Sequence, residues 1–201
     1  PGSGRAAEGG KLRIGFQKSS TLIALLKEES ALEKALAPLN VTVTWHEFTS
    51  GLPIMEALNA GQIDVSADVA DTVPIFAQAA NPDLLYVGHE PAAPKGEAIL
   101  VAQDGPIRTV ADLRGKKIAL NKGSNVHYFL VRALEQAGVP YEAVTPTFLA
   151  PADGAAAFAR GAVDAWAIWD PYFAIAERQP GTRILASAAE IEKPTNFFLG
   201  N

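Results

Sequence analysis

Two ten-residue stretches, one hundred positions apart, repeat one pattern: EALNAGQIDV at residues 56–65 and AAFARGAVDA at residues 156–165. Each predicts the end of a helix, a glycine that terminates it, and a short strand with an aspartate, Asp64 or Asp164, at the same place. A second pair lies upstream, LRIGFQKSS at residues 12–20 and KIALNKGS at residues 117–124. Each member predicts a buried strand, a Lys-x-Ser turn and then a helix. The repeat therefore predicts two similar α/β lobes and a cleft that one helix N-terminus from each lobe would face.

Strands alternate with helices throughout the chain. The clearest helical pattern follows Ser124, where apolar residues recur at helical spacing until Gly138 and Pro140 end it. Residues 21–37 predict one helix, and residues 163–168 predict a buried strand. This alternation predicts that each lobe holds a mostly parallel sheet flanked by helices.

The chain divides by pattern into a tail and two lobes. Residues 1–10 carry four glycines and no hydrophobic pattern, so we expect a disordered tail. Lobe one is placed at residues 11–101 and lobe two at residues 102–201. Because the chain stops directly after an apolar run, we expect a C-terminal portion to be missing.

The composition excludes several classes of function. Hydrophobic residues make up 48% of the 201 residues, and a net charge of -5 without a basic run argues against nucleic-acid binding. Cysteine is absent, and no apolar run approaches the ~20 residues of a membrane-spanning helix. The pairs His46–Glu47 and His89–Glu90 lack a third ligand, so no metal site is expected. No motif of a catalytic triad, a phosphate loop or paired carboxylates indicates catalysis.

Four segments carry a family resemblance: IGFQKSS at 14–20, DTVPIFAQAA at 71–80, NKGSNVH at 121–127 and DAWAIWDP at 164–171. With them the chain resembles the aliphatic sulfonate-binding proteins of bacterial ABC importers. The resemblance implies a type II periplasmic-binding-protein fold, in which two α/β lobes joined by a two-strand hinge close on a small organosulfonate. It also implies a monomer without a cofactor, periplasmic or lipid-anchored at the outer face of the cytoplasmic membrane, which delivers its ligand to an ABC permease.

The chain departs from the family pattern at two places. The family's return crossover to lobe one falls near residues 197–199, at the end of lobe two, and the helices that finish lobe one are absent from this sequence. The stretch SADVA at residues 66–70 has an extra residue, the acid Asp68, and Ala70 in place of a glycine, while Val73 replaces a proline. The family fold places this stretch at the mouth of the cleft. Taurine, nitrate or a pyrimidine precursor as ligand, and an enzyme on the same fold, therefore remain alternatives.

Three helix starts are candidate anion sites, because free N–H groups and the helix dipole bind anions there. Ser19 and Ser20 precede the first helix, Ser50 and Gly51 the third, and Ser124 and Asn125 the matching helix of lobe two. The competing interpretation is plain N-capping, which favours the same residue types. Lys18 and Lys122 occupy matched places and are interpreted as solvated.

The remaining candidates follow strands or begin helices. His127 is either a ligand donor or a structural residue, and strand alternation assigns Trp166 to the core and Trp169 to the cleft wall. Asp71 and Asp170 either cap helices and hold turns or accept a ligand amine, which would favour a zwitterionic aminosulfonate. The predicted ligand-binding set, with no catalytic residue and no metal, is Gln17, Ser19, Ser20, Ser50, Gly51, Asp71, Thr72, Ser124, Asn125, His127, Trp169 and Asp170.

Overall fold

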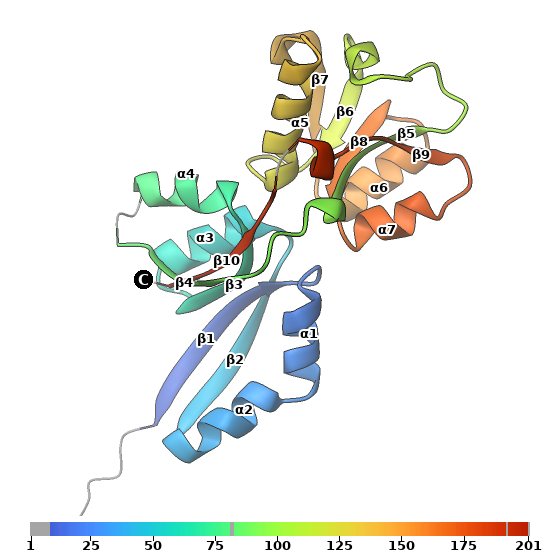
Figure 1. Cartoon of the computed structure of the whole chain (residues 1–201). Coiled ribbons are helices and arrows are strands. Elements are labelled where there is room, and N and C mark those ends of the chain that lie inside the picture. Colours follow the sequence, from blue (N-terminus) through green and yellow to red (C-terminus); the bar gives the residue numbers. More distant parts are fainter. Residues whose placement is uncertain (1–8, 81–82, 192, 201) are drawn as a thin grey trace, which may run out of the picture. The chain divides into compact units, whose positions relative to one another are not determined.

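A computed structural model describes residues 9–80, 83–191 and 193–200, and these divide into two compact units (Figure 1). Unit 1 takes the described residues within Pro1–Val69, Ala77–His89 and Phe197–Asn201, and unit 2 takes those within Ala70–Phe76 and Glu90–Asn196. Most of the predicted tail, residues 1–8, lies outside the described residues, and Gly10 already opens the first strand. Among the described residues each unit contains one five-stranded sheet.

The unit 1 sheet has the strand order β2-β1-β3-β10-β4. Strand β1 runs parallel to β2 and β3, as the strand–helix alternation predicts, whereas β10 runs antiparallel to β4. The strands are β1 (Gly10–Gln17), β2 (Val41–Phe48), β3 (Val65–Ala70), β4 (Leu85–His89) and β10 (Asn196–Gly200). The helices are α1 (Thr21–Glu28), α2 (Ala31–Leu36), α3 (Gly51–Asn59) and α4 (Thr72–Ala80), the last of which is shared between the units.

The single helix predicted over residues 21–37 is wrong, because the chain forms two helices there. Ser30 separates α1 from α2 with a left-handed backbone (φ 51°), which a continuous helix cannot contain. The break lets Ile23 of α1 and Leu32 of α2 pack on one core cluster with Phe16 of β1. Tertiary packing therefore overrides a sequence that favours helix throughout.

The unit 2 sheet has the strand order β7-β6-β8-β5-β9. Strand β6 runs parallel to β7 and β8, and β5, which arrives from unit 1, runs antiparallel to β8 and β9. The strands are β5 (Glu97–Ala102), β6 (Lys117–Leu120), β7 (Thr145–Phe148), β8 (Ala165–Trp169) and β9 (Thr182–Ser187), and the helices are α5 (Asn125–Gln136), α6 (Pro151–Ala159) and α7 (Tyr172–Glu177).

Both faces of the unit 2 sheet are covered. Ala165 and Ala167 of β8 pack in a cluster with α5, and Trp166 and Ile168 pack in a second cluster with α6 and α7. This alternation is the two-residue period of a strand buried on both sides. Trp166 is buried in the second cluster, which confirms its assignment to the core.

The repeated glycines end α3 and α6 in the same way. Gly61 and Gly161 both adopt left-handed backbones (φ 66° and 68°), a conformation that glycine reaches without steric cost. In both turns the residue after the glycine donates its N–H to a helix carbonyl 2.9 Å away, Gln62 to Ala57 and Ala162 to the equivalent residue. The repeat read from the sequence is therefore one helix-terminating turn used twice.

The repeated aspartates also share one structural role. A 2.8 Å bond joins the Arg13 N–H to the Asp64 carboxylate, and another joins the Asp64 N–H to the Arg13 carbonyl. Asp164 makes the same two bonds with Lys117, also at 2.8 Å. Each aspartate thus ties the residue before its own strand, β3 or β8, to the neighbouring parallel strand.

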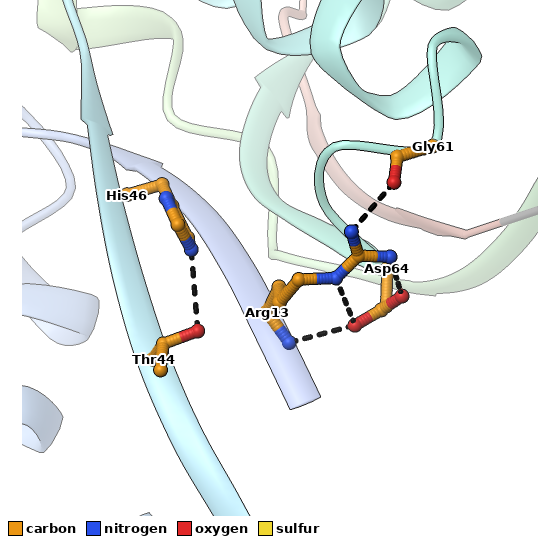
Figure 2. Close-up of polar contacts among 5 residues, drawn as sticks. All are labelled: Arg13, Thr44, His46, Gly61 and Asp64. Carbon is orange, nitrogen blue, oxygen red and sulfur yellow. Dashed lines mark hydrogen bonds and ion pairs between the residues drawn. The ribbon is translucent and has the colours of Figure 1, made fainter. Parts of the chain in front are cut away.

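In unit 1 the Asp64 carboxylate is also bound by the guanidinium of Arg13, whereas the residue at the matching place in unit 2 is Lys117. Figure 2 shows Arg13 reaching both carboxylate oxygens of Asp64, through Nε at 3.1 Å and a terminal nitrogen at 2.5 Å. The other terminal nitrogen donates to the Gly61 carbonyl at 2.6 Å. The hydrogen bonds from this guanidinium lower the pKa of Asp64, against a smaller opposing effect of burial. Beside them, the Thr44 hydroxyl lies 3.2 Å from His46 Nε2.

We expect Asp64→Asn to make the stability of the protein less sensitive to acid. A carboxyl whose folded-state pKa is lowered contributes stability above its unfolded pKa, and this is lost as the pH falls through the folded pKa. The urea midpoint of the wild type should therefore fall more steeply than that of the variant between about pH 5 and about pH 2. Arg13→Met, which removes the guanidinium and leaves the acid, should reproduce the shallower slope. Equal slopes for Asp64→Asn and wild type would contradict the role assigned to the pair.

Candidate functional site

Three parallel strands of unit 1 end at one edge of the sheet, and the predicted polar residues follow them. Gln17 closes β1 beside Phe48, the last residue of β2. Ser20 and Ser50 come next along the chain, as the residues before α1 and α3, and both are buried. Neither serine side chain caps its own helix. The structure therefore brings together the unit 1 candidates Gln17, Ser19, Ser20, Ser50 and Gly51 at the carboxyl ends of the strands, where open α/β sheets bind ligands.

Two buried hydroxyls in unit 1 have no hydrogen-bond partner within the described part of the chain. They are the Oγ atoms of Ser20, at the start of α1, and of Ser66, on β3. A buried polar group left unpaired costs roughly 1–3 kcal/mol, so such groups call for an explanation. A ligand oxygen bound at the α1 N-terminus would satisfy the Ser20 hydroxyl.

Asp68 gives strand β3 an unusual backbone. Its φ of 57° is left-handed in the middle of a strand, and its carbonyl accepts a 2.9 Å bond from Gln17 Nε2. Non-glycine residues held in this region cluster at functional sites. At this position the left-handed backbone and the turned carbonyl of Asp68 meet Gln17, a predicted site residue.

The unit 2 candidates gather around the start of α5. Ser124 precedes the helix, and its hydroxyl donates to the Asn121 carbonyl at 2.7 Å instead of capping α5. The next residue, Asn125, donates its side-chain N–H to Glu97 Oε1 at 2.6 Å. Glu97 is a buried acid at the start of β5 that the sequence analysis missed. Its one visible signal is a lone acid that opens an apolar run.

Trp169 is the last residue of β8, and Asp170 follows it. Trp169 is half-buried and contacts both core clusters of unit 2. Asp170 Oδ1 accepts the Ala174 N–H at 3.0 Å, which ties the first turn of α7, and the Asp170 N–H donates to the Gly96 carbonyl at 2.9 Å. Asp170 thus performs the helix-holding role, one of the two that the sequence left open.

Both ring nitrogens of His127 are engaged inside unit 2. Nδ1 accepts the Gly123 backbone N–H at 3.1 Å, so in the neutral ring the proton sits on Nε2, which lies 2.8 Å from the Tyr141 hydroxyl. Burial, and then the charge of Lys122, lower the pKa of His127. A neutral imidazole held at both nitrogens orders the turn before α5, which is the structural alternative predicted for this residue.

Asp71 and Thr72 lie at the start of α4. Asp71 donates its backbone N–H to the Thr195 carbonyl at 2.9 Å and accepts the Thr195 N–H on its side chain at 3.3 Å. Burial raises the pKa of Asp71, opposed by backbone N–H groups that donate to its carboxylate, first that of Thr195. The Thr72 hydroxyl is buried and, within residues 9–80, 83–191 and 193–200, has no hydrogen-bond partner.

The two lysines at matched places, Lys18 and Lys122, have different surroundings. Lys18 forms an exposed ion pair with Glu47 at 3.3 Å, and Lys122 Nζ lies 5.7 Å from the centre of the Phe148 ring. Among the described residues no group of three or more His, Cys, Asp or Glu is placed to hold a metal ion. In that same part of the chain, no helix has the length and apolarity needed to cross a membrane.

Two curated binding proteins are similar to most of this chain. This chain is 50% identical over 188 residues to a putative aliphatic sulfonates-binding protein of Escherichia coli (strain K12). The aligned region covers 94% of this chain and 58% of that protein. A protein of the same description from Bacillus subtilis (strain 168) is 38% identical over 177 residues, or 88% of this chain and 53% of that one. The chain thus spans little more than half the length of these relatives.

Solved structures confirm the predicted fold. The periplasmic aliphatic sulphonate binding protein SsuA from Escherichia coli matches with a TM-score of 0.83 at 48% identity, covering 96% of this chain and 65% of that one. The alkanesulfonate-binding protein SsuA from Xanthomonas axonopodis pv. citri, bound to MOPS, matches with a TM-score of 0.88 at 44% identity, covering 97% and 66%. The two sheets with flanking helices are therefore the type II periplasmic-binding fold.

A family model described as "ABC transporter, phosphonate, periplasmic substrate-binding protein" matches residues 28–197. The match extends over well more than half of the chain, in both units. The protein therefore belongs to this family of periplasmic substrate-binding proteins of ABC transporters.

Proposed function

We propose that this protein binds a small organosulfonate and delivers it to an ABC importer. The observation that carries the proposal is the Ser20 hydroxyl, which is buried at an uncapped helix N-terminus and has no partner among the described residues. A sulfonate offers three oxygens that only accept hydrogen bonds, and it carries one negative charge. Backbone N–H groups and hydroxyls at helix N-termini match that chemistry.

The comparisons support this substrate class. Two curated relatives are described as aliphatic sulfonate binders, and one matched structure holds MOPS, itself a sulfonate. We propose the same class here, with a permease as partner, a monomeric state, a location in the periplasm or at the outer face of the cytoplasmic membrane, and no enzymatic activity. Trp169 would supply the flat apolar wall for the ligand tail.

A thermal-shift panel tests the proposal. Propane-1-sulfonate, taurine, MOPS, methylphosphonate and nitrate are compared at equal concentration, because a ligand at about 100 times its dissociation constant stabilises the fold by roughly 2.7 kcal/mol. We expect a shift with at least one sulfonate and none with nitrate. A shift with methylphosphonate or nitrate alone would show that the substrate class is wrong.

Ser20→Ala should weaken sulfonate binding by about tenfold or more, because a hydrogen bond to a charged group contributes roughly 1.5–3 kcal/mol. The ligand-free protein should be as stable as the wild type or more so, since the substitution removes an unpaired buried hydroxyl. Titration calorimetry and the ligand-free melting temperature measure the two effects.

Two serine variants serve as comparisons. Ser124→Ala should weaken binding less, because its hydroxyl already donates to the Asn121 carbonyl. Ser187 is the last residue of β9, and its hydroxyl accepts the Ala189 N–H. Ser187→Ala should therefore leave binding unchanged. Unaltered affinity in Ser20→Ala would remove Ser20 from the site.

A further inference from the structure

The turn before α5 is held by a histidine that follows it in the chain. Gly123 donates its backbone N–H to Nδ1 of His127 at 3.1 Å, and the Ser124 hydroxyl between them donates to the Asn121 carbonyl at 2.7 Å. Gly123 has a left-handed backbone (φ 70°), so the chain changes direction at this residue before it enters the helix. The contact with His127 therefore fixes the segment in which the candidate residues Ser124 and Asn125 lie.

The other side of the imidazole ring is fixed by elements that follow α5. Nε2 lies 2.8 Å from the hydroxyl of Tyr141, which opens the short helix η4 (Tyr141–Ala143). The ring centre also lies 5.5 Å from that of Phe148, the last residue of β7. The imidazole thus joins the turn before α5 to two elements that come after the helix, all within unit 2.

Protonation of the ring would break its contact with Gly123. A neutral Nδ1 accepts a hydrogen bond through its lone pair, whereas both nitrogens of an imidazolium carry protons. Two N–H donors, one on Nδ1 and one on Gly123, would then face each other at 3.1 Å. The Tyr141 oxygen does not oppose protonation in this way, because it can accept from Nε2 in either form of the ring.

The surroundings of His127 favour the neutral ring. Burial, and then the charge of Lys122 in the turn, lower its pKa. The ring also lies in the first turn of α5, where the positive end of the helix dipole disfavours a cation. Burial raises the pKa of Tyr141, so the hydroxyl that faces Nε2 stays uncharged, and the Phe148 ring carries no charge. The contact with Gly123 is therefore made by the form of the ring that this part of the fold stabilises.

We propose that His127 is a pH-sensitive latch: its neutral ring holds the turn before α5, and its protonation releases that turn as the pH falls. Release of Gly123 frees the segment that carries Ser124 and Asn125, so the order of these candidate residues follows the pH. The inference goes beyond the proposed function, because it concerns the ligand-free protein and holds for any ligand.

Nuclear magnetic resonance of isotope-labelled, ligand-free protein tests the latch directly. The nitrogen shifts of the imidazole report the protonation of His127, and hydrogen exchange, corrected for the intrinsic effect of pH, reports the protection of the Gly123 amide. We expect His127 to titrate below about pH 6.5, the ordinary value for a histidine. The Gly123 amide should lose its protection several-fold with the same midpoint.

The stability of the protein should respond in the same pH range. A base whose folded-state pKa is lowered contributes its full stability above its unfolded pKa of about 6.5, and this is lost as the pH falls toward the folded pKa. The urea midpoint of the wild type should therefore decrease more between about pH 7.5 and about pH 5 than that of a variant without the titrating ring.

His127→Asn is that variant, and it separates titration from packing. The asparagine oxygen can take the place of Nδ1 and accept the Gly123 N–H, but it binds no proton in this range. Protection of the Gly123 amide should stay within about twofold of its neutral-pH value down to about pH 5. His46→Asn, in an exposed histidine of unit 1, should keep the wild-type pH dependence at Gly123.

Tyr141→Phe gives a second, independent readout. It keeps the contact between Nδ1 and Gly123 and removes the acceptor at Nε2. Because an imidazolium donates more strongly than a neutral ring, loss of this acceptor should move the release of Gly123 to lower pH. This variant decides the question if His127→Asn does not fold.

Several results would overturn the latch. They are a Gly123 amide that stays protected while the ring becomes protonated, a ring that stays neutral until the protein unfolds, and an equal loss of protection in His127→Asn. A midpoint in Tyr141→Phe that is unchanged or higher than in the wild type would also contradict it. Because each measurement is made without ligand, these results leave the sulfonate proposal to the thermal-shift panel.

Discussion

Phe129→Ala is expected to destabilise the protein by about 3–5 kcal/mol, the cost of emptying a large buried aromatic site. Phe129 is 0% exposed and lies in the cluster that joins α5 to the unit 2 sheet. The same cluster includes Leu120 and Val101, which belong to two different strands, so the cavity cannot close by a shift of one element. Urea denaturation followed by tryptophan fluorescence measures the loss, since Trp166 and Trp169 both report on unit 2.

The adjacent residue provides the control for this substitution. Tyr128 lies on the same helix but is 45% exposed, so Tyr128→Ala should change the stability by no more than about 0.5 kcal/mol. Comparable losses in the two variants would mean that the cluster is not the packed core of unit 2.

Trp166→Ala should have a similarly large effect, again about 3–5 kcal/mol. Trp166 is 2% exposed on β8, and its ring centre lies 6.2 Å from that of Phe158 on α6. The packing leaves no spare room, because a Cβ added at Gly154 would lie only 2.7 Å from the indole nitrogen. Removing the indole therefore takes away much of the packing between α6 and the sheet it covers.

Trp169→Ala is the matched control, with the same residue type three positions along the same strand. Because Trp169 is only half-buried, its loss should cost the ligand-free protein clearly less stability. Circular dichroism during thermal unfolding avoids the change in fluorescence. A larger loss at Trp169 than at Trp166 would reverse the core and wall assignments.

The elements that the sequence predicts best are those with a local cause. The apolar stripe after Ser124 predicts α5, and Gly61 and Gly161 predict the ends of α3 and α6, because helix periodicity and left-handed glycines act within a few residues. The helix predicted over residues 21–37 fails because its break at Ser30 serves the packing of Leu32, which lies beyond the break, against β1.

In the candidate site, too, only the features with a local cause could be predicted from the sequence. Serines before helices are visible in the sequence, and the structure places Ser20, Ser50 and Ser124 before α1, α3 and α5. The sequence does not show which hydroxyl is already bonded, because the partner of Ser124 is set by the turn geometry and the isolation of Ser20 by the packing around it. Whether these residues bind the ligand is a prediction for the experiments above.

Contacts between residues far apart in the sequence were not predicted, and Glu97, which makes one of them, was missed altogether. Glu97 meets Asn125 across 28 positions, and Gln17 meets the Asp68 carbonyl across 51. Neither pair has a spacing that any local period could reveal, since the packing of the strands and of α5 brings the partners together.

By itself the sequence determined that this protein has two similar α/β units, because the repeated helix end, glycine and aspartate are local signals with a local physical cause. It also determined where the helices that could bind an anion begin. Only the tertiary structure decided what the repeated aspartates do, since Asp64 and Asp164 act on strands 51 and 47 positions away. It likewise decided that Glu97, the buried acid at the start of β5, meets Asn125 at the start of α5, because burial and hydrogen bonding depend on which elements become neighbours.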